Sequence, residues 1–402
     1  MEQKADVVIV GGGLAGSLTA LRLATAHPQM RVVLVEKGDQ LGGRRTWSFF
    51  EAELGSDETM KWLEPVIDRS WDGVSVKFPK LEKDVTRRFH AIRSETLHKK
   101  VLELLGDGVV LHAEVSRLTE SHVELENGDV FGARLILDAR GLDEASGPSI
   151  TGYQKFIGLE FELAEPHGLT APVLVDACCP QLDGLRYFSL LPWDEKRVLI
   201  EETYYSDSQT VNRERIHRSL TAYAERRDWK IVSVSREEWD VIPIPMSGDY
   251  IKQSIGGQPL PIGVRGGFFH AATGRSFAET VRIAEFLSSL EDHATHFARL
   301  RLVKFKKPWM SRQRFYRLLN RFIFFAAEPS LRYQVLQHIY AQSPDLVVRF
   351  LNGRTSWADR IRLLSSGVPV PRERALRSLT EDALHSWAAA RTRNGGAAES
   401  HL

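Results

Sequence analysis

Residues 5–16 read ADVVIVGGGLAG, an apolar run that leads directly into a glycine-rich turn. Residues 7–10 contain no polar position, which predicts a strand buried on both faces of a sheet. Leucines at helical spacing follow the turn, and residues 31–36 read RVVLVE, a second buried strand closed by Glu36. This order of strand, glycine turn, helix, strand and acid predicts an α/β, Rossmann-like domain that binds a dinucleotide.

The three glycines of the G-x-G-x-x-G pattern are Gly11, Gly13 and Gly16. They allow a tight turn, close approach of the backbone to a pyrophosphate, and close packing of the helix on the strand. The phosphates are expected beside Leu14 and Ala15, because the free N–H groups and dipole of a helix N-terminus favour anions. Glu36 stands 20 residues after Gly16, where an acid is placed to accept hydrogen bonds from a ribose.

The composition is that of a globular protein. The 402 residues include 53 Lys and Arg and 52 Asp and Glu, a net charge of +1, which excludes a basic protein that coats nucleic acid. Apolar residues make up 43%, which excludes a disordered chain. Adjacent Cys178 and Cys179 support neither a disulfide framework nor a zinc site, so we expect no metal and a cytoplasmic location. No run of about 18 apolar residues is present, so we expect no membrane-spanning segment.

Hydrophobic patterning divides the rest of the chain. Short alternating strands between residues 153 and 245 predict an antiparallel sheet with one face available to a substrate, and Pro243 and Pro245 mark the return to the first domain. Helical patterns dominate the C-terminal part. We expect a discontinuous dinucleotide-binding domain (1–75, 91–150 and 246–292), a substrate domain (76–90 and 151–245), a membrane-facing helical region (293–392) and a flexible tail (393–402).

One segment departs from the even charge balance. Residues 301–325 carry eight basic residues and no acid, interleaved with bulky apolar side chains. An aromatic stripe beside arginines is the pattern of a helix that lies on a membrane surface. The alternative is a helix packed on the body of the protein, with its arginines in water. The residues expected at a membrane are Arg314, Phe315, Arg317, Leu318, Arg321 and Phe322.

Several loops resemble those of flavoproteins. Gly42-Gly43-Arg44-Arg45 is similar to the loop by which glutathione-reductase-like flavoproteins add a second glycine pair and an arginine near FAD. Asp138 and Gly141 resemble the Asp-Gly that ends a strand in the aromatic hydroxylases, and a glycine-rich turn again opens a late helix after Gly263. The resemblance favours FAD, held by segments far apart in the chain. Its expected contacts beyond the first unit are Arg44, Arg45, Asp138, Gly263, His270, Thr273, Gly274 and Ser276.

Longer motifs together resemble the bacterial lycopene beta-cyclases over nearly the whole chain. They are Gly43-x-x-Thr46-Trp47-Ser48-Phe49, Pro166-His167-Gly168-Leu169, Ile200-Glu201-Glu202-Thr203-x-Tyr205, Phe269-His270-x-x-Thr273-Gly274-x-Ser276 and Asp138-x-Arg140-Gly141. The third also resembles the Phe-Leu-Glu-Glu-Thr motif of plant carotenoid cyclases. The chain departs from the bacterial pattern at Arg44-Arg45, where Asn-His is frequent, and at Ala271-Ala272, where Pro-Thr is frequent.

The resemblance implies acid-catalysed cyclisation of the ends of an acyclic C40 carotenoid, from lycopene through gamma-carotene to beta-carotene. It implies reduced FAD as cofactor, NAD(P)H as reductant, no net redox change and, with the basic helix, peripheral membrane association. The alternative is a monooxygenase or prenyl reductase that uses FAD and NAD(P)H on a lipophilic isoprenoid. Hydroxylases of this fold carry Gly-Asp before the late helix, whereas Val264 follows Gly263 here, which argues against that alternative.

The implied catalytic residues are Glu201 and Glu202. Neighbours in a strand point to opposite faces, so only one of them can face a substrate cavity. A glutamate in a dry pocket suits the role of acid, because burial raises the pKa of a carboxyl and keeps it protonated near neutral pH. Of the two, we prefer Glu201 by analogy with the first acid of the motif. Aromatic rings stabilise cations by their π faces, and the candidate substrate-binding rings are those of Trp47, Phe49 and Tyr205.

Overall fold

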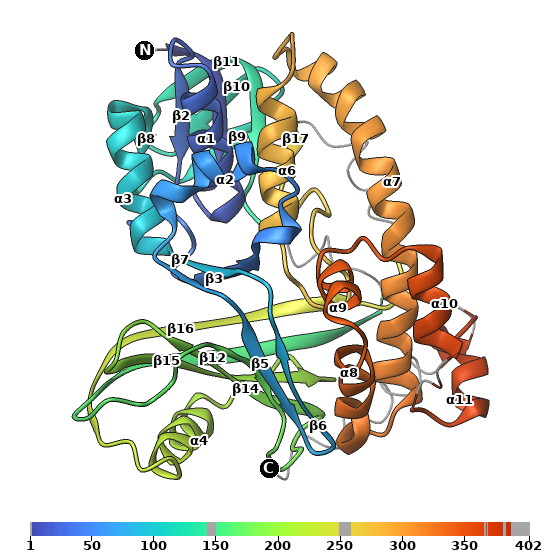
Figure 1. The fold of residues 1–402 in the computed structure, drawn as a ribbon. Helices are drawn as coiled ribbons and strands as arrows, with labels where there is room; N and C mark the ends of the chain where they lie inside the picture. The colour runs from blue at the N-terminus through green and yellow to red at the C-terminus, as the bar shows by residue number, and fades with distance from the viewer. Residues whose placement is uncertain are drawn as a thin grey trace.

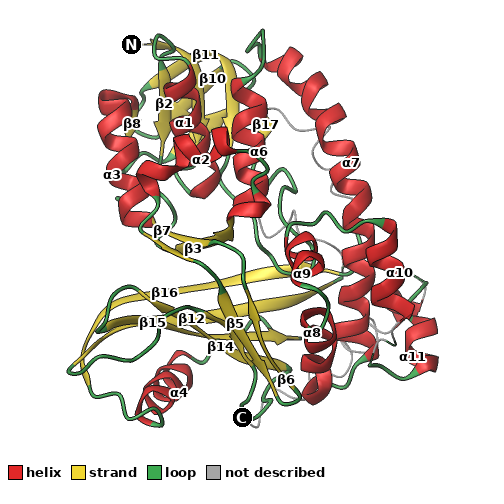
Figure 2. Cartoon of the chain, viewed as in Figure 1, coloured by secondary structure: helices red, strands yellow, loops and turns green. Residues whose placement is uncertain are grey.

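Three β-sheets organise the described part of the chain, and a group of helices follows them (Figure 1). The computed structural model describes residues 2–142, 150–248, 259–365, 367, 369–380 and 383–386. One large sheet lies at each end of the molecule, with a small sheet between them, and the C-terminal helices run along one side (Figures 1 and 2).

The first sheet contains the predicted dinucleotide-binding unit. The glycine turn joins β1 (Glu2–Val10) to α1 (Leu14–Ala26), and β2 (Val32–Val35) returns parallel to β1. Residues 7–10 are at most 2% exposed, which confirms a strand covered on both faces. The sheet order is β8-β2-β1-β11-β10-β9, with β17 beside β11. These further strands are β8 (Val109–Val110), β9 (Val115–Leu118), β10 (His122–Leu125), β11 (Val130–Asp138) and β17 (Leu260–Pro261).

Two helices pack against α1 on this sheet. They are α3 (Ser94–Leu105) and α6 (Phe277–Ser288), the second of which comes from a distant part of the chain. Leu97 and Val101 of α3 are fully buried, as their helical spacing predicts. The first domain is therefore assembled from segments that lie far apart in sequence.

The second sheet has seven strands in the order β16-β12-β15-β14-β13-β5-β6, with mostly antiparallel neighbours. Helix α4 (Arg213–Glu225) covers one face through Ile216 and Leu220, which leaves the other face toward the rest of the molecule. The strands are β5 (Val74–Phe78), β6 (Leu81–Val85), β12 (Thr151–Leu163), β13 (Val173–Asp176), β14 (Leu185–Pro192), β15 (Arg197–Ser206) and β16 (Ile231–Pro245).

Strand β16 contains Pro243 and Pro245, the two prolines predicted to mark the return of the chain to the first domain. Pro243 and Pro245 pair with Tyr153 and Thr151 of β12. Proline is tolerated because β16 is an edge strand, whose outer side needs no ladder hydrogen bond. The strand therefore continues to Pro245.

A small third sheet stands between the two large sheets, and a short helix that follows its first strand packs on the first domain. The sheet is formed by β3 (Thr46–Phe50), β7 (Phe89–Arg93) and β4 (Arg69–Trp71), and α2 (Asp57–Leu63) follows β3. Ser56 caps α2 by accepting the N–H of Thr59 at 3.2 Å. The third sheet thus carries the Thr46–Phe50 motif to the space between the two larger sheets.

The C-terminal helices cover the open side of this space. The longest, α7 (Thr295–Arg321), contains Pro308 and ends in a π-helical turn, Phe322–Ala326. The others are α8 (Arg332–Tyr340), α9 (Pro344–Leu351), α10 (Trp357–Ser365) and α11 (Arg372–Arg377). Among the described residues, no helix is long and apolar enough to cross a membrane.

The aromatic stripe of α7 packs inward, which corrects the prediction that it faces a membrane. Phe315 and Phe322 belong to the same buried cluster as Tyr205 and Tyr340, and Leu318 packs against that cluster. Arg321 is buried and donates from Nε to the carbonyl of Met246 at 3.0 Å. Arg314 is exposed and Arg317 half-buried. The stripe is the core face of a packed helix, as in the alternative stated above.

Candidate functional site

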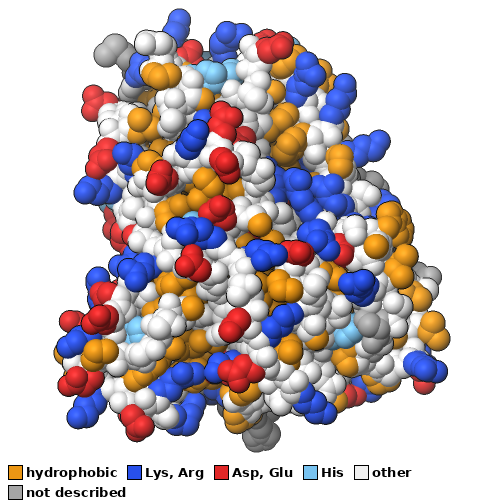
Figure 3. Space-filling view, in the orientation of Figure 1, with side chains coloured by type: hydrophobic (Ala, Val, Ile, Leu, Met, Phe, Trp, Pro, Cys, Tyr) orange, Lys and Arg blue, Asp and Glu red, His pale blue; other side chains and the backbone are white. Residues whose placement is uncertain are grey.

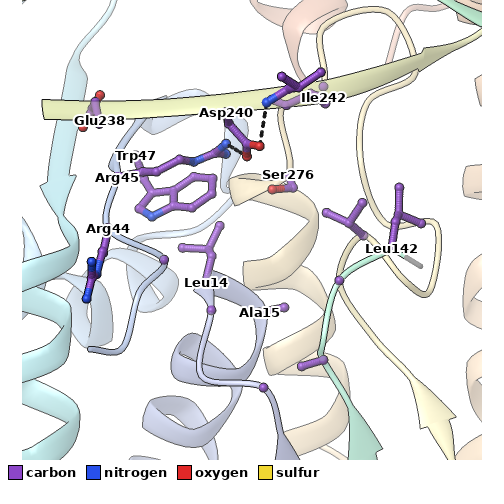
Figure 4. A pocket seen from close by; sticks show the side chains of 18 of the residues that line it. Leu14, Ala15, Arg44, Arg45, Trp47, Leu142, Glu238, Asp240, Ile242 and Ser276 are labelled. Carbon is purple, nitrogen blue, oxygen red and sulfur yellow. Dashed lines mark hydrogen bonds and ion pairs between the residues drawn. The ribbon is translucent and has the colours of Figure 1, made fainter. Parts of the chain in front are cut away.

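A cavity of about 870 Å³ lies where the glycine turn meets β16 (Figure 4). Of the predicted cofactor residues, those that line it are Gly11, Gly13, Leu14, Ala15, Glu36, Arg44, Arg45, Gly274 and Ser276. Figure 4 shows that Leu14 and Ala15 come from the start of α1, whereas Glu238 and Asp240 come from β16. The first and second sheets therefore share this cavity.

Each glycine of the turn has a different structural requirement. Gly11 has φ +103° and a Cβ there would lie 2.7 Å from the backbone of Ala139, so only glycine fits. A Cβ on Gly16 would lie 1.9 Å from the carbonyl oxygen of Gly11, so Gly16 serves packing and does not line the cavity. A Cβ on Gly13 would meet no atom within 4 Å. The open space of the turn is therefore at Gly13.

The start of α1 fits a ligand with phosphate groups. Gly13 is the N-cap residue of α1, no side chain caps the helix, and its first turn contains no acid. Free N–H groups and the helix dipole therefore face a cavity large enough for a nucleotide. These residues fit the dinucleotide that the sequence predicts.

Glu36 binds the glycine turn by accepting hydrogen bonds from two backbone N–H groups. Its Oε2 accepts the N–H of Gly12 at 2.6 Å and its Oε1 accepts the N–H of Gly38 at 2.8 Å. Each carboxylate oxygen retains a second lone pair, so Glu36 still has acceptor capacity toward the cavity.

The basic pair before β3 has two different environments. Arg44 has φ +53°, is exposed and pairs with Asp39. Arg45 pairs with Asp240 of β16 and lies over the ring of Trp47, 4.3 Å from its centroid (Figure 4). Trp47 also donates to the carbonyl of Gly42 at 3.0 Å. Arg45 and Trp47 thus join the third sheet to β16 along the cavity wall.

Asp138 and Gly263 do not line the first cavity, but they hold segments that do. Asp138 is buried and accepts Nη2 of Arg140 at 2.9 Å and Nε of Arg265 at 2.8 Å. A Cβ on Gly263 would lie 2.4 Å from Cβ of Ala15, so glycine allows this loop to pack on α1. Both residues position neighbouring segments.

His270 lines neither of the two cavities described here, contrary to its predicted place among the cofactor residues. It is buried, its Nε2 donates to the carbonyl of Phe350 at 2.8 Å, and its ring lies 4.3 Å from that of Tyr316. Burial lowers the pKa of His270 to about 3, so its imidazole is neutral. Its contacts tie the late glycine turn to the C-terminal helices.

A second cavity, of about 140 Å³, lies on the face of the second sheet that α4 leaves free. Glu201 and Tyr205 of β15 line it, together with Thr273, which we predicted as a cofactor residue. Most of its other lining side chains are apolar or aromatic. Examples are Phe89 of β7, Leu174 of β13, Tyr187 of β14, and Leu336 and Tyr340 of α8. Polar and charged side chains, among them Ser48, Glu201 and Arg275, line the rest of the cavity. The apolar and aromatic wall suits a lipophilic ligand, and the polar groups can fix its orientation.

The two cavities are separated by two segments that contribute alternate residues to each. Thr46 and Ser48 line the second cavity, whereas Trp47 lines the first. Thr273 and Arg275 likewise line the second, and Gly274 and Ser276 the first. Glu238 of β16 lines both cavities.

Glu201 has a strongly raised pKa. Its environment raises its pKa to about 7, chiefly by burial and then by the nearby Glu238, against the lowering effects of Thr203 and Arg45. Thr203 donates from Oγ1 to the Glu201 carboxyl at 2.7 Å. A carboxyl with such a pKa can act as a general acid.

Glu202 lies on the opposite face of β15, toward α4. It is fully buried and accepts Nε of Arg186 at 2.5 Å and the hydroxyl of Tyr204. Arg186 in turn donates to Ser219 of α4 at 2.6 Å. Glu202 therefore belongs to a buried ion pair that joins the sheet to its covering helix.

The predicted substrate rings are not all in the second cavity. Only Tyr205 lines it, and its hydroxyl donates to the carbonyl of Ala272 at 3.1 Å. Trp47 lines the first cavity. Phe49 is fully buried, stacked on Phe277 with centroids 4.3 Å apart, and is a core residue.

Glu238 lies in the site although none of the sequence motifs described above contains it. The available signal is a pair of adjacent acids, Glu237 and Glu238, inside a segment of predicted strands, the same arrangement as Glu201 and Glu202. What brings Glu238 to the site is the pairing of β16 with β12, which the sequence does not display.

A family model and the relatives that span nearly the whole chain point to one family. A family model described as lycopene cyclase protein matches residues 6–377. A lycopene beta-cyclase of Pantoea ananas is 35% identical over 390 residues, which cover 94% of this chain and 99% of the relative. A lycopene beta-cyclase of Paracoccus sp. is 32% identical over 381 residues, 94% of this chain and 97% of the relative.

Solved structures share the fold at low sequence identity. A geranylgeranyl bacteriochlorophyll reductase-like protein of Thermoplasma acidophilum superposes with a TM-score of 0.61 at 12% identity, covering 95% of this chain and all of that one. A flavin-dependent brominase superposes with a TM-score of 0.55 at 17% identity, covering 90% of this chain and 98% of that one.

Proposed function

Because the chain belongs to the lycopene cyclase family, we propose that it is a lycopene beta-cyclase that closes the ends of an acyclic C40 carotenoid into beta-ionone rings. The observation that carries the proposal is Glu201, a carboxyl with a pKa of about 7 in a cavity with an apolar and aromatic wall. Cyclisation needs a proton donor inside a site that accepts a hydrocarbon, and this cavity supplies both.

The proton moves to and from Glu201 in this mechanism. Glu201 donates its proton to the terminal double bond of the substrate, which leaves a tertiary cation. The electron pair of the neighbouring double bond closes the ring, and the ring then loses a proton to the Glu201 carboxylate. The products are one beta-ionone end and a reprotonated Glu201, so the step consumes no reductant.

Aromatic side chains surround the position of the cation. The rings of Phe89, Tyr187, Tyr205 and Tyr340 line the second cavity. A desolvated ring face stabilises a cation by about 2 kcal/mol. The same rings exclude water, which would otherwise add to the cation and give an alcohol.

We assign the first cavity to FAD, with NAD(P)H as the source of its electrons. Gly11, Gly13 and the first turn of α1 would hold the pyrophosphate, and Glu36 a ribose. Reduced FAD supplies an electron-rich ring system that stabilises a neighbouring positive charge. The two cavities meet at Glu238, so this assignment brings the cofactor site next to the substrate site.

A lipid-soluble substrate requires access from a bilayer, and we propose peripheral association with an anionic membrane through α10 and α11. Trp357, Ile361 and Leu364 share one face of α10 and are 77%, 60% and 39% exposed. Leu376 and Leu379, in and just after α11, are 66% and 54% exposed. Figure 3 shows hydrophobic side chains along the edge of the molecule where α10 lies.

Arginines surround this apolar surface, which we define as the α10–α11 surface. Its exposed arginines are Arg354, Arg362, Arg372, Arg374 and Arg377, of which Arg374 pairs with Glu328 and Arg377 with Glu373. Apolar side chains that enter the acyl boundary, ringed by cations that meet anionic headgroups, are the features of an interfacial membrane site. The charge of the rim therefore favours an anionic bilayer over a neutral one, at the cytoplasmic side.

The function is tested by anaerobic incubation of the protein with FAD, NAD(P)H and lycopene in liposomes, followed by chromatography. We expect gamma-carotene and beta-carotene, with NAD(P)H consumption far below one equivalent per ring. An oxygenated or saturated product without a cyclic one would instead establish the monooxygenase or prenyl reductase alternative.

A further inference from the structure

Glu201 and Glu238 stand in one row across the second sheet. Glu201 of β15 pairs with Gly158 of β12, and Gly158 pairs with Glu238 of β16. Directly paired residues of antiparallel strands point to the same face, so both acids stand on the cavity face. Two strand spacings, about 10 Å in all, separate their backbones.

Gly158 lies between the two acids in this row of paired residues. A Cβ on Gly158 would lie 3.1 Å from Cγ of Glu238 and 3.1 Å from Cδ1 of Leu199. Gly158 has no left-handed backbone conformation that would require glycine. The lack of a side chain at Gly158 therefore lets the side chains of Glu238 and Leu199 pack over the strand between the two acids.

The two carboxyls receive different numbers of hydrogen bonds. Oε2 of Glu238 accepts the N–H of Thr46 at 2.8 Å, the Oγ1 hydroxyl of Thr46 at 2.9 Å and Nη2 of Arg236 at 2.8 Å. The Glu201 carboxyl accepts the hydroxyl of Thr203. Burial raises the pKa of Glu238, and Arg236, Thr46 and Arg45 oppose that effect. Donors aimed at a carboxylate favour its ionised form, and Glu238 receives more of them than Glu201, so Glu238 is the better place for the charge and Glu201 for the proton.

Resting on the cyclase function above, we propose that Glu238 is a positioning residue: an ionised carboxylate that keeps the proton on Glu201 and faces the cation made by proton transfer. Two carboxylates on one face repel each other, so deprotonation of Glu201 is unfavourable in the resting site. Proton transfer places a positive charge in the cavity at the moment Glu201 becomes negative. Glu238 then attracts that charge, and it gains or loses no proton in the cycle.

Other charged and titratable groups near the two acids have to be considered in any pH measurement. Burial raises the pKa of each tyrosine in the second cavity, so none of them titrates near neutral pH. The arginines are cationic throughout this range. These groups, by element, are Arg45 before β3, Arg93 of β7, Glu160 of β12, Tyr187 of β14, Tyr205 of β15, Arg236 of β16, Arg275 before α6 and Tyr340 of α8.

The test measures the protonation of Glu201 directly. Infrared difference spectra of the purified full chain without substrate are recorded across neutral pH, and the carboxyl band absent from Glu201→Gln is assigned to Glu201. In Glu238→Gln we expect its midpoint to move by about one pH unit toward acid. Glu238→Asp retains the charge and should restore most of the midpoint. The matched control is Glu162→Gln, which removes an exposed carboxylate farther along β12 and should leave the midpoint unchanged.

The activity profile is the second readout. The fall of the cyclisation rate with rising pH should move toward acid by the same amount in Glu238→Gln. An unmoved infrared midpoint in folded Glu238→Gln overturns this inference. If that variant does not fold, Glu238→Ala removes the same charge with a smaller side chain and should shift the midpoint in the same direction, and no shift overturns the inference as well. Wild-type protein that forms no cyclic product overturns the proposed function instead, whatever the infrared result.

Discussion

Glu201 and Glu202 are neighbours in β15, yet their carboxyls serve opposite faces of the second sheet. Glu201 lines the second cavity, whereas Glu202 is fully buried toward α4 and bound to Arg186. The alternation of side chains along a strand makes this division unavoidable once the register is set. The pair therefore combines a proton donor, Glu201, with a residue that stabilises the fold, Glu202. Replacing Glu201 should reduce activity, whereas replacing Glu202 should reduce stability.

Glu201→Gln should lower the rate of cyclisation by about 10²–10⁴-fold, because glutamine cannot donate the proton. The amide is close in size to the carboxyl, so the fold and flavin binding should persist. Product chromatography, flavin fluorescence and thermal unfolding check the three expectations. Retention of full activity would exclude Glu201 as the acid.

Glu202→Ala should reduce the free energy of unfolding by about 3–5 kcal/mol, because it leaves Arg186 buried without its carboxylate. Urea unfolding followed by circular dichroism measures the change. The exposed Glu162 provides the control, since Glu162→Ala should change stability by less than about 0.5 kcal/mol. If Glu202→Ala were as stable as wild type but inactive, Glu202 would be the acid.

The cyclisation rate should fall as pH rises through about 7, the value to which its environment raises the pKa of Glu201. The folded-state pKa lies above the ordinary value of 4.5, so folding favours the protonated form. That contribution to stability is complete below about pH 4.5 and is lost as pH rises through about 7. Glu201→Gln should therefore gain stability relative to wild type above neutral pH. A pH-independent difference in stability between them would contradict the raised pKa.

Gly13→Asp should separate folding from cofactor binding. A side chain at this position meets no neighbouring atom, and aspartate is a favourable N-cap, so stability should stay equal or rise by up to about 1 kcal/mol. A carboxylate at the start of α1 would repel a pyrophosphate, so we expect flavin affinity to fall at least about tenfold. Thermal unfolding and flavin titration measure the two effects, with Gly13→Ser as the uncharged control. Unchanged affinity for flavin would move the phosphates away from α1.

Replacing Trp357 and Ile361 together by serine should weaken co-sedimentation with anionic vesicles, because both side chains are exposed on α10. The control replaces Val232 and Val234, which are 63% and 50% exposed on β16, by serine and should leave sedimentation unchanged. If both double variants lost vesicle binding, or if neither did, the α10–α11 surface would not be the site of membrane association. Arg321→Gln is unsuitable for this test, because Arg321 is buried and its replacement should lower the melting temperature.

Local pattern was enough to predict the dinucleotide unit. Gly11 requires a conformation and a clearance that only glycine provides, and the turn that follows β1 has the predicted spacing to α1, β2 and Glu36. These features depend on residues close in sequence, so the order of residues displays them directly. The adjacent acids of β15 were equally visible, as was the rule that only one can face a cavity.

Tertiary structure decided what depends on partners distant in the chain. Pairing of β15, β12 and β16 puts Glu201 on the cavity face and brings Glu238 into its row, and no local pattern contains that register. Helix α7 has an apolar stripe that suits a protein core and a bilayer equally, since both remove apolar surface from water, and the stripe packs in the core. The amino-acid sequence by itself determined which groups were available for cofactor binding and acid catalysis. The packing of sheets and helices decided which of them meet, because register and burial are set by the whole fold.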